Sequence, residues 1–245
     1  RQIGAPLSKH TNIVTSIAFS PDGKALVSGS YDGSFILWDL TAREPFGDLV
    51  RQHNDWVNGV AFFSNGNNLA SASDDYRVVL WNIKDAAKPE MISELPNENG
   101  TYIRAMAISP DDQILASGDL GGSIILWNIS NPEKPVKIGE ALNLENGQGI
   151  NSLAFSADGK TLASSSFGEP FVLWDVVSHK RISEPLVGGS NAVSKVIFGL
   201  DEKTLISGSS DTTISFWDIS DRKEPHKTGD SSQGHLGQPS SMYFS

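Results

Sequence analysis

Histidine, serine, aspartate and tryptophan recur at the same separations in two places. The first set is His10, Ser28, Asp32 and Trp38, and the second is His53, Ser71, Asp75 and Trp81. A serine, a histidine and an aspartate in contact can form a hydrolytic triad, in which the histidine activates the serine hydroxyl as a nucleophile. Because one active site needs only one nucleophile, the duplication favours a structural role, and we expect no catalytic residue here.

These positions belong to a repeating unit. The stretch from Ser28 to Asp39, SGSYDGSFILWD, returns as SASDDYRVVLWN, SGDLGGSIILWN, SSSFGEPFVLWD and SGSSDTTISFWD. The five repeat tryptophans are Trp38, Trp81, Trp127, Trp174 and Trp217, and each follows a phenylalanine or isoleucine by 19 residues. The intervals between successive tryptophans are 43, 46, 47 and 43 residues, so the length varies outside that segment. This pattern predicts a repeat array.

Each unit has the pattern of four short strands. The first unit, TSIAFSPDGKALVSGSYDGSFILWDL, is predicted to form three strands joined by Pro-Asp-Gly and Asp-Gly turns, with EPFGDLV (44–50) as a fourth. The third strands, such as FILW and VVLW, are apolar without alternation, as expected when both faces of a strand are covered. The sequence therefore predicts an all-β protein whose sheets stack face to face.

Composition limits the partners. The net charge of −10 and a sequence pI near 4.9 disfavour a nucleic acid or an anionic membrane as the main partner. The chain contains no cysteine, which excludes disulfides and thiolate metal sites and fits a cytoplasmic location. No apolar run approaches the roughly 20 residues needed to cross a bilayer. Acidic pairs such as Asp74/Asp75 lie in turns that favour aspartate, so we expect neither metal nor cofactor.

The period, the four strands per unit and the Trp-Asp or Trp-Asn dipeptide resemble the WD40-repeat β-propeller family, in a bacterial-type array. Asn82 and Asn128 depart from the family's aspartate. The resemblance implies four-stranded antiparallel blades and a seven-bladed ring or longer array, of which this chain would be a part. We expect residues 1–7 to end a preceding blade, 232–245 to begin a sixth unit, and full repeats at about 8–51, 52–97, 98–144, 145–187 and 188–231.

The resemblance also gives the His, Ser, Asp and Trp set a structural meaning. In the family, the indole bonds the serine, the serine bonds the histidine, and the histidine bonds the aspartate. Only the first two units carry the whole set, whereas the fifth keeps Ser207, Asp211 and Trp217. The third and fourth units have asparagine and glycine in place of histidine and aspartate.

Partners of the family usually bind the face that carries the inter-blade loops and the turns between second and third strands. Three positions per unit point there by resemblance, and their most distinctive residues are Tyr31, Trp56, Asn58, Asp74, Tyr102, Arg104, Leu120, Asn151 and Phe167. Aromatic residues and arginine dominate binding energy in protein interfaces. We therefore expect a non-catalytic scaffold or sensor that binds a protein or peptide, or other domains of the same polypeptide.

Two further expectations rest on the resemblance. The array would form the C-terminal part of a larger, bacterial signalling protein, which could carry a catalytic domain upstream. The alternative function is a propeller enzyme with a hydrolytic or metal-dependent site at the channel mouth. Among the face positions only Asp74 is a carboxylate, which disfavours that alternative.

Overall fold

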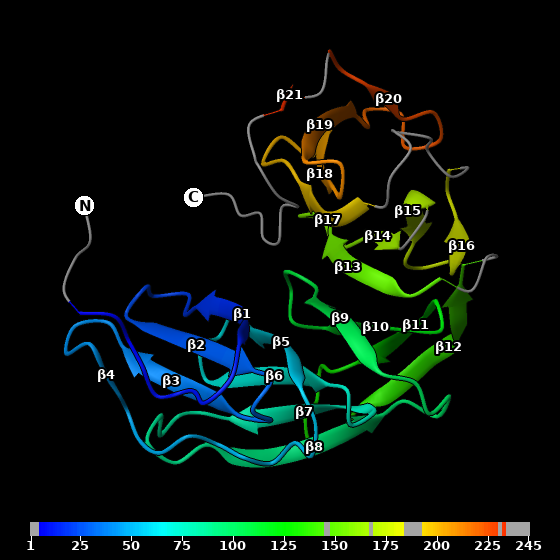
Figure 1. Cartoon of the computed structure of the whole chain (residues 1–245). Coiled ribbons are helices and arrows are strands. Elements are labelled where there is room, and N and C mark those ends of the chain that lie inside the picture. The colour runs from blue at the N-terminus through cyan, green and yellow to red at the C-terminus, as the bar shows by residue number, and fades with distance from the viewer. Residues whose placement is uncertain (1–4, 145–147, 167–168, 184–192, 230–231, 234–245) are drawn as a thin grey trace. The chain divides into compact units, whose positions relative to one another are not determined.

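The computed structural model describes residues 5–144, 148–166, 169–183, 193–229 and 232–233. The regular elements among them are β-strands, which form five antiparallel sheets (Figure 1). Contacts divide the chain into two compact units, Arg1–Ile103 with Asn131–Pro135, and Arg104–Ser130 with Val136–Ser245. The all-β prediction, with four-stranded antiparallel blades, is confirmed.

The first of these two compact units contains two sheets, and in each sheet the strands lie in the order of the sequence. Sheet one consists of β1 (Val14–Phe19), β2 (Ala25–Ser30), β3 (Phe35–Asp39) and β4 (Glu44–Pro45). Sheet two consists of β5 (Val57–Phe62), β6 (Asn68–Ser73), β7 (Arg77–Asn82) and β8 (Glu90–Pro96).

The second unit holds the other three sheets. Sheet three consists of β9 (Ile103–Ile108), β10 (Ile114–Asp119), β11 (Ser123–Asn128) and β12 (Val136–Asn143). Sheet four consists of β13 (Ile150–Phe155), β14 (Thr161–Ser166), β15 (Glu169–Asp175) and β16 (Lys180–Arg181). Sheet five consists of β17 (Val193–Phe198), β18 (Thr204–Ser209), β19 (Thr213–Asp218) and β20 (His226–Lys227), with β21 (Ser232–Gln233) also paired to β19.

The turn between first and second strands follows from its side chains. In sheet one, the Ser20 hydroxyl donates to Asp22, and the same carboxylate accepts the Lys24 amide at 3.0 Å. Gly23 has φ 69°, in the left-handed region that glycine adopts without strain. Ser109 with Asp111 and Ser156 with Asp158 repeat the arrangement in sheets three and four, so the same side chains specify the turn in these three repeats.

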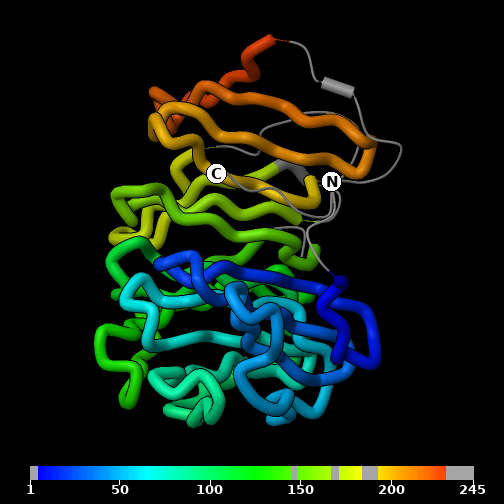
Figure 2. Tube along the Cα trace, turned by 90° about the vertical axis from the view of Figure 1, so that its left-hand side faces the viewer, coloured from blue at the N-terminus to red at the C-terminus, as the bar shows by residue number. Residues whose placement is uncertain are grey.

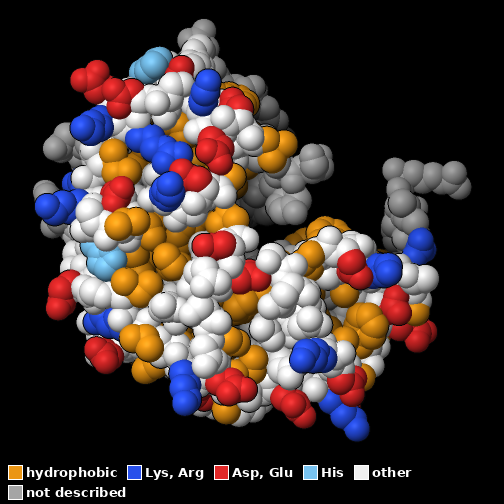
Figure 3. All heavy atoms as spheres, turned by 180° about the vertical axis from the view of Figure 1, so that it is seen from behind, with side chains coloured by type: hydrophobic (Ala, Val, Ile, Leu, Met, Phe, Trp, Pro, Cys, Tyr) orange, Lys and Arg blue, Asp and Glu red, His pale blue; other side chains and the backbone are white. Residues whose placement is uncertain are grey.

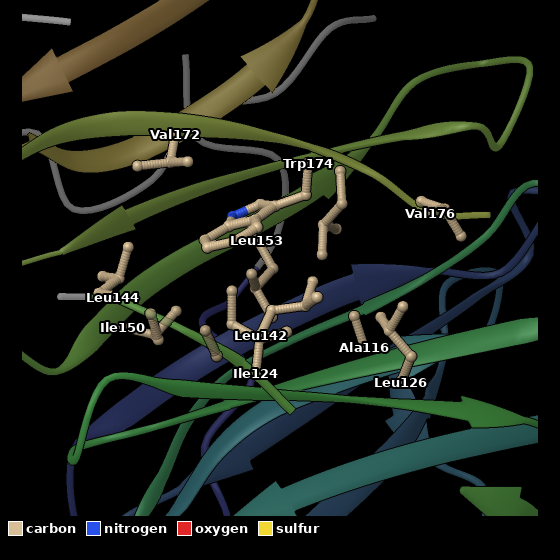
Figure 4. Close-up of a cluster of buried hydrophobic side chains, with 12 residues drawn as sticks. Ala116, Ile124, Leu126, Leu142, Leu144, Ile150, Leu153, Val172, Trp174 and Val176 are labelled. Carbon is tan, nitrogen blue, oxygen red and sulfur yellow. The ribbon is translucent and has the colours of Figure 1, made fainter. Parts of the chain in front are cut away.

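The third strands form the centre of each core. Phe35, Ile36, Leu37 and Trp38 of β3 are all buried, as the continuous apolar pattern predicted. In the first unit, Phe35 and Leu37 pack with Val57, Val60 and Trp81 of sheet two. In the second unit, Ile124 and Leu126 pack with Ile150, Leu153 and Trp174 (Figure 4). Adjacent sheets within each unit thus share one apolar layer, and Figure 2 shows sheet five as orange strands over the yellow-green strands of sheet four.

The outer strands vary most in length. Residues 44–50 were expected to form one strand, but β4 comprises Glu44–Pro45, and a separate bridge pairs Phe35 with Val50. By contrast, β8 has seven residues and β12 has eight. Variation in repeat length is therefore taken up at this edge.

The structure describes five blades and gives no support to a seven-bladed ring. Residues 232–233, expected at the start of a sixth repeat, pair with Thr213 and Ile214 of sheet five. This pairing extends the edge of sheet five beyond the short β20, and the division of the sequence at residue 232 stays a prediction. Phe244, the residue that would mark the sixth unit, lies outside the described residues.

Candidate functional site

In sheet one, the repeated polar residues form a continuous chain of hydrogen bonds. The Trp38 indole donates to the Ser28 Oγ at 2.8 Å, and that oxygen lies 2.8 Å from His10 Nε2. His10 Nδ1 lies 3.1 Å from Asp32 Oδ2, which also accepts the Thr11 amide at 2.8 Å. The chain of bonds therefore ties the loop before β1 to β2, β3 and the turn between them.

Sheet two repeats the geometry and adds a cation. The Trp81 indole donates to Ser71 at 2.9 Å, His53 lies 2.7 Å from Ser71 and 2.9 Å from Asp75, and Arg77 Nε donates to Asp75 at 3.0 Å. Arg77 also contacts Glu94 on β8 and the Gln52 carbonyl. Arg77 occupies the position that Ser34 has in sheet one. Asp75 therefore lacks the hydroxyl contact that Asp32 receives from Ser34. Among the described residues, Asp75 Oδ1 has no hydrogen-bond partner.

Both aspartates are held in their ionised form. Burial alone would raise the pKa of Asp32, but hydrogen bonds from Ser34, the Thr11 amide and His10 outweigh it and lower the pKa to about 2. Burial likewise opposes the shift at Asp75, where His53, the Asn54 amide and Arg77 lower the pKa to about 2.

The buried position of the serines decides what this set can do. Ser28 is 4% exposed and Ser71 is fully buried, and each hydroxyl already accepts an indole N–H. A nucleophile must reach its substrate, whereas these oxygens lie beneath the sheet surface. The arrangement satisfies polar groups in the interior and offers no site for acyl transfer.

The later sheets keep only part of the set. The indoles of Trp127, Trp174 and Trp217 donate to Ser117, Ser164 and Ser207 at 3.2, 2.8 and 2.9 Å. Asp211 accepts the Thr213 amide at 3.0 Å and thereby stabilises its own turn. The tryptophan–serine bond is thus common to all five sheets.

Two stacked aromatic pairs lie on the loop side of the first unit. The Tyr31 and Trp56 rings have centroids 4.0 Å apart at an angle of 20°. The Tyr76 and Tyr102 rings have centroids 5.5 Å apart at 8°. Trp56, Tyr76 and Tyr102 remain 39%, 43% and 37% exposed. We call these four residues the aromatic face.

Backbone bonds hold the aromatic face in place. The Tyr31 amide donates to the Ile13 carbonyl at 3.0 Å, and the Asp74 amide donates to the Trp56 carbonyl at 2.9 Å. Each bond joins the turn between second and third strands to the loop before the first strand. The rings therefore project from fixed backbone.

Tyr76 was missed in the sequence. It follows the turn aspartate at the position of Gly33, and both residues have a left-handed backbone, with φ 70° and 78°. A large aromatic at a position that favours glycine was the available signal.

Asn58 and Asn151 were expected on the partner-binding face, but their side chains reach neighbouring strands. Asn58 Nδ2 donates to Asp74 at 2.6 Å and to the Ile103 carbonyl at 2.9 Å, and Asn151 Nδ2 donates to the Val193 carbonyl at 3.3 Å. Register shifts typical of β-bulges lie at both positions and can redirect a side chain. Asp74 itself is 4% exposed. These bonds hold the three side chains in place, and the role of these residues in partner binding stays a prediction.

The remaining predicted face residues lie in or beside the second unit. Leu120 is 39% exposed, and a Cβ at Gly149 would collide with its side chain. Arg104 is half-buried at the start of β9. Phe167 lies outside the described residues.

A groove of about 710 Å³ lies at the other end of sheets one and two, where the sequence offered no signal. Its lining includes Asp22, Asp39, Phe46, Phe62 and Ala86.

On the face shown in Figure 3, acidic and basic side chains are scattered among apolar ones. Among the described residues, no three His, Asp or Glu side chains gather closely enough to hold a metal ion.

The sheets and the repeated tryptophan–serine bond define a WD-repeat protein. The WD40 family model, described as "WD domain, G-beta repeat", matches residues 2–39, 47–82, 90–128, 141–168 and 181–218. These matches cover more than half of the sequence, and the chain belongs to this family. No curated protein matches the chain significantly. Within the described residues, no helix has the length and apolar character to span a membrane.

Proposed function

We propose that the chain is a non-catalytic scaffold or sensor module that binds a protein or peptide through the aromatic face. The observation that carries this proposal is the pair of exposed ring stacks, Tyr31 with Trp56 and Tyr76 with Tyr102. WD40 domains typically serve as protein-interaction scaffolds, which supports the same function.

The energetics of the aromatic face suit a binding site. Tyrosine and tryptophan supply large contact areas with few rotatable bonds, so ordering them on binding costs little conformational entropy. Here each ring already rests on a second ring, and the backbone bonds of Tyr31 and Asp74 fix the turns. Such pre-organisation leaves more of the contact energy for affinity.

The alternative of a propeller enzyme has less support. The Ser28 and Ser71 hydroxyls are buried, and Asp74, the carboxylate among the expected face residues, is 4% exposed and bonded to Asn58. Membership of a larger, cytoplasmic signalling protein stays a prediction from the resemblance.

A peptide-display library tests the proposal. Peptides selected on the 245-residue chain would be labelled, and their dissociation constants measured by fluorescence anisotropy. Trp56→Ala should weaken binding at least tenfold, because an aromatic hot spot contributes about 2 kcal/mol or more. Phe46→Ala is the matched control, since Phe46 is similarly exposed (37%) but lines the groove at the other end of sheet one. Equal affinity for the wild type and Trp56→Ala would reject the aromatic face as the site.

A further inference from the structure

The groove between sheets one and two has a counterpart between sheets four and five, where an arginine side chain bridges the two sheets. Arg222, which follows β19, donates from Nη1 to the Thr161 hydroxyl at the start of β14. The same nitrogen lies 3.7 Å from Asp158 Oδ2, in the turn before β14. Thr161 is only 1% exposed. This place in the second unit therefore holds a guanidinium group supplied by the chain itself.

In sheets one and two, alanine stands at both positions that make the hydrogen bond. Counted from the repeat tryptophans, Ala86 has the position of Arg222, and Ala25 has the position of Thr161. Both alanines are half-buried, and both line the groove of about 710 Å³. The sequence of the first unit thus omits the side chain that occupies the counterpart, and a groove lies in its place.

The backbone presents residues 86 and 222 in the same way. Asp85 and Asp221 form the same turn, in which the carboxylate accepts the amide two residues ahead at 3.0 and 2.9 Å. Their carbonyls accept the amide three residues ahead at 3.0 and 3.2 Å. The groove therefore differs from its counterpart in side chains and not in the turn that carries them.

The charged residues around Arg222 have equivalents in the groove. Asp22, Lys24 and Asp39 line the groove, and sheet four has the same residue types at the same positions, namely Asp158, Lys160 and Asp175. Lys24 lies 3.9 Å from Asp22, and both side chains are largely exposed, so this pair contributes little. Two carboxylates and one weakly paired ammonium favour a further cation in the groove.

The groove also has an apolar part. Leu37 and Ile83 form buried walls, and Phe46 remains 37% exposed. The volume is that of a small-ligand pocket and exceeds what one arginine side chain fills. An occupant that carries an apolar residue beside its arginine would cover Phe46 as well as reach the carboxylates.

We propose that this groove binds an arginine side chain that a partner protein presents next to an apolar residue. The occupant is an arginine because Arg222 occupies the equivalent place beside the same charged residues in the second unit. The planar guanidinium carries donors for both Asp22 and Asp39, whereas a lysine offers a single point charge. The groove lies at the opposite end of the sheets from the aromatic face, so the two sites are independent.

A display library of short peptides with a fixed central arginine tests the proposal. Peptides selected on the 245-residue chain would be labelled, and their dissociation constants measured by fluorescence anisotropy. Ala86→Arg should weaken groove ligands at least tenfold, because the added side chain would fill the groove as Arg222 fills its counterpart. Asp22→Asn should weaken them about tenfold, since it removes the charge but keeps an oxygen for the turn. Trp56→Ala should leave their affinity unchanged, which separates the groove from the aromatic face.

Ala157→Arg is the matched control, because Ala157 is exposed in sheet four and does not line the groove. This variant adds the same charge and should bind like the wild type. Thermal midpoints should show that all variants fold, and that of Ala86→Arg should not lie below the wild type. In the peptides, replacing the arginine by lysine should weaken binding, and replacing it by alanine should abolish it.

Two results would overturn the proposal. One is a selection that yields no peptide sensitive to Ala86→Arg, including one whose ligands respond to Trp56→Ala alone and so support the aromatic face. The other is a groove ligand whose affinity is unchanged when alanine replaces its arginine.

Discussion

The His, Ser, Asp and Trp set shows how burial decides the chemistry of a residue combination. A triad and this network use the same side chains, but Ser71 is fully buried and accepts the Trp81 indole. Its hydroxyl is therefore held in the interior, out of reach of a substrate. The network spans the pre-strand loop, the second strand and the third strand, so its contribution is to stability.

Loss of the aspartate should cost more than loss of the serine. Asp75→Ala removes the acceptor of His53, the Asn54 amide and Arg77, and we expect it to destabilise the protein by about 3 kcal/mol or more. Ser164→Ala removes the acceptor of the Trp174 indole alone and should cost about 1–2 kcal/mol. Thermal unfolding measures both, and equal losses in midpoint would contradict this ranking.

Spacing alone brings the network residues together, because strand register fixes which side chains meet. It does not reveal the roles of Asn58 and Tyr76. Asn58 lies at a bulge, which turns its amide towards the Ile103 carbonyl. Tyr76 depends on a left-handed backbone that a repeat pattern predicts for glycine. Local backbone geometry decides what these two side chains contact, and sequence periodicity does not encode that geometry.

At the scale of elements, the inner three strands of each sheet were predictable and the fourth was not. Turn residues and continuous apolar runs such as FILW fix the inner strands, because burial leaves one register open to them. The outer strand faces solvent on one edge, and its length follows local contacts. In sheet one, Gly47 lies so close to Ala87 that the loop packs backbone to backbone.

Gly47→Ala should therefore destabilise the first unit. A Cβ at this position would collide with the Ala87 carbonyl. The backbone must shift to remove this collision, which costs about 1–3 kcal/mol of stability. Lys9, which donates to the Gly47 carbonyl at 3.0 Å, should lose part of that bond. Urea unfolding measures the loss, and Asp48→Ala, at a fully exposed neighbour, should leave the midpoint nearly unchanged. Equal midpoints for the two variants would rule out the close approach.

At the scale of the whole molecule, ionised aspartates are distributed along the chain. Eight aspartates in the described part have a lowered pKa, namely Asp22, Asp32, Asp75, Asp111, Asp158, Asp175, Asp201 and Asp218. Hydrogen bonds from turn amides and hydroxyls to these carboxylates lower the values. The same turn chemistry that defines the repeats thus makes the fold sensitive to acid.

Stability should fall as the pH decreases from about 4.5 towards 2. A carboxyl whose folded pKa lies below its unfolded value of 3.8 stabilises the fold above that value, and the contribution disappears as the pH approaches the folded pKa of about 2. Urea midpoints measured against pH test this expectation. The double variant Asp32→Asn/Asp75→Asn should show a shallower decline, and a decline as steep as that of the wild type would contradict the assignment.

The left-handed position that follows the turn between second and third strands in sheets one, two, three and five has a consequence for evolution. Glycine occupies it at Gly33 and Gly122, and Thr212 and Tyr76 adopt the same backbone with a side chain. Random substitution at such a position drifts towards glycine when only folding is under selection, because glycine relieves the strain. A lineage that retains an aromatic ring at Tyr76 would therefore record selection on what the surface does.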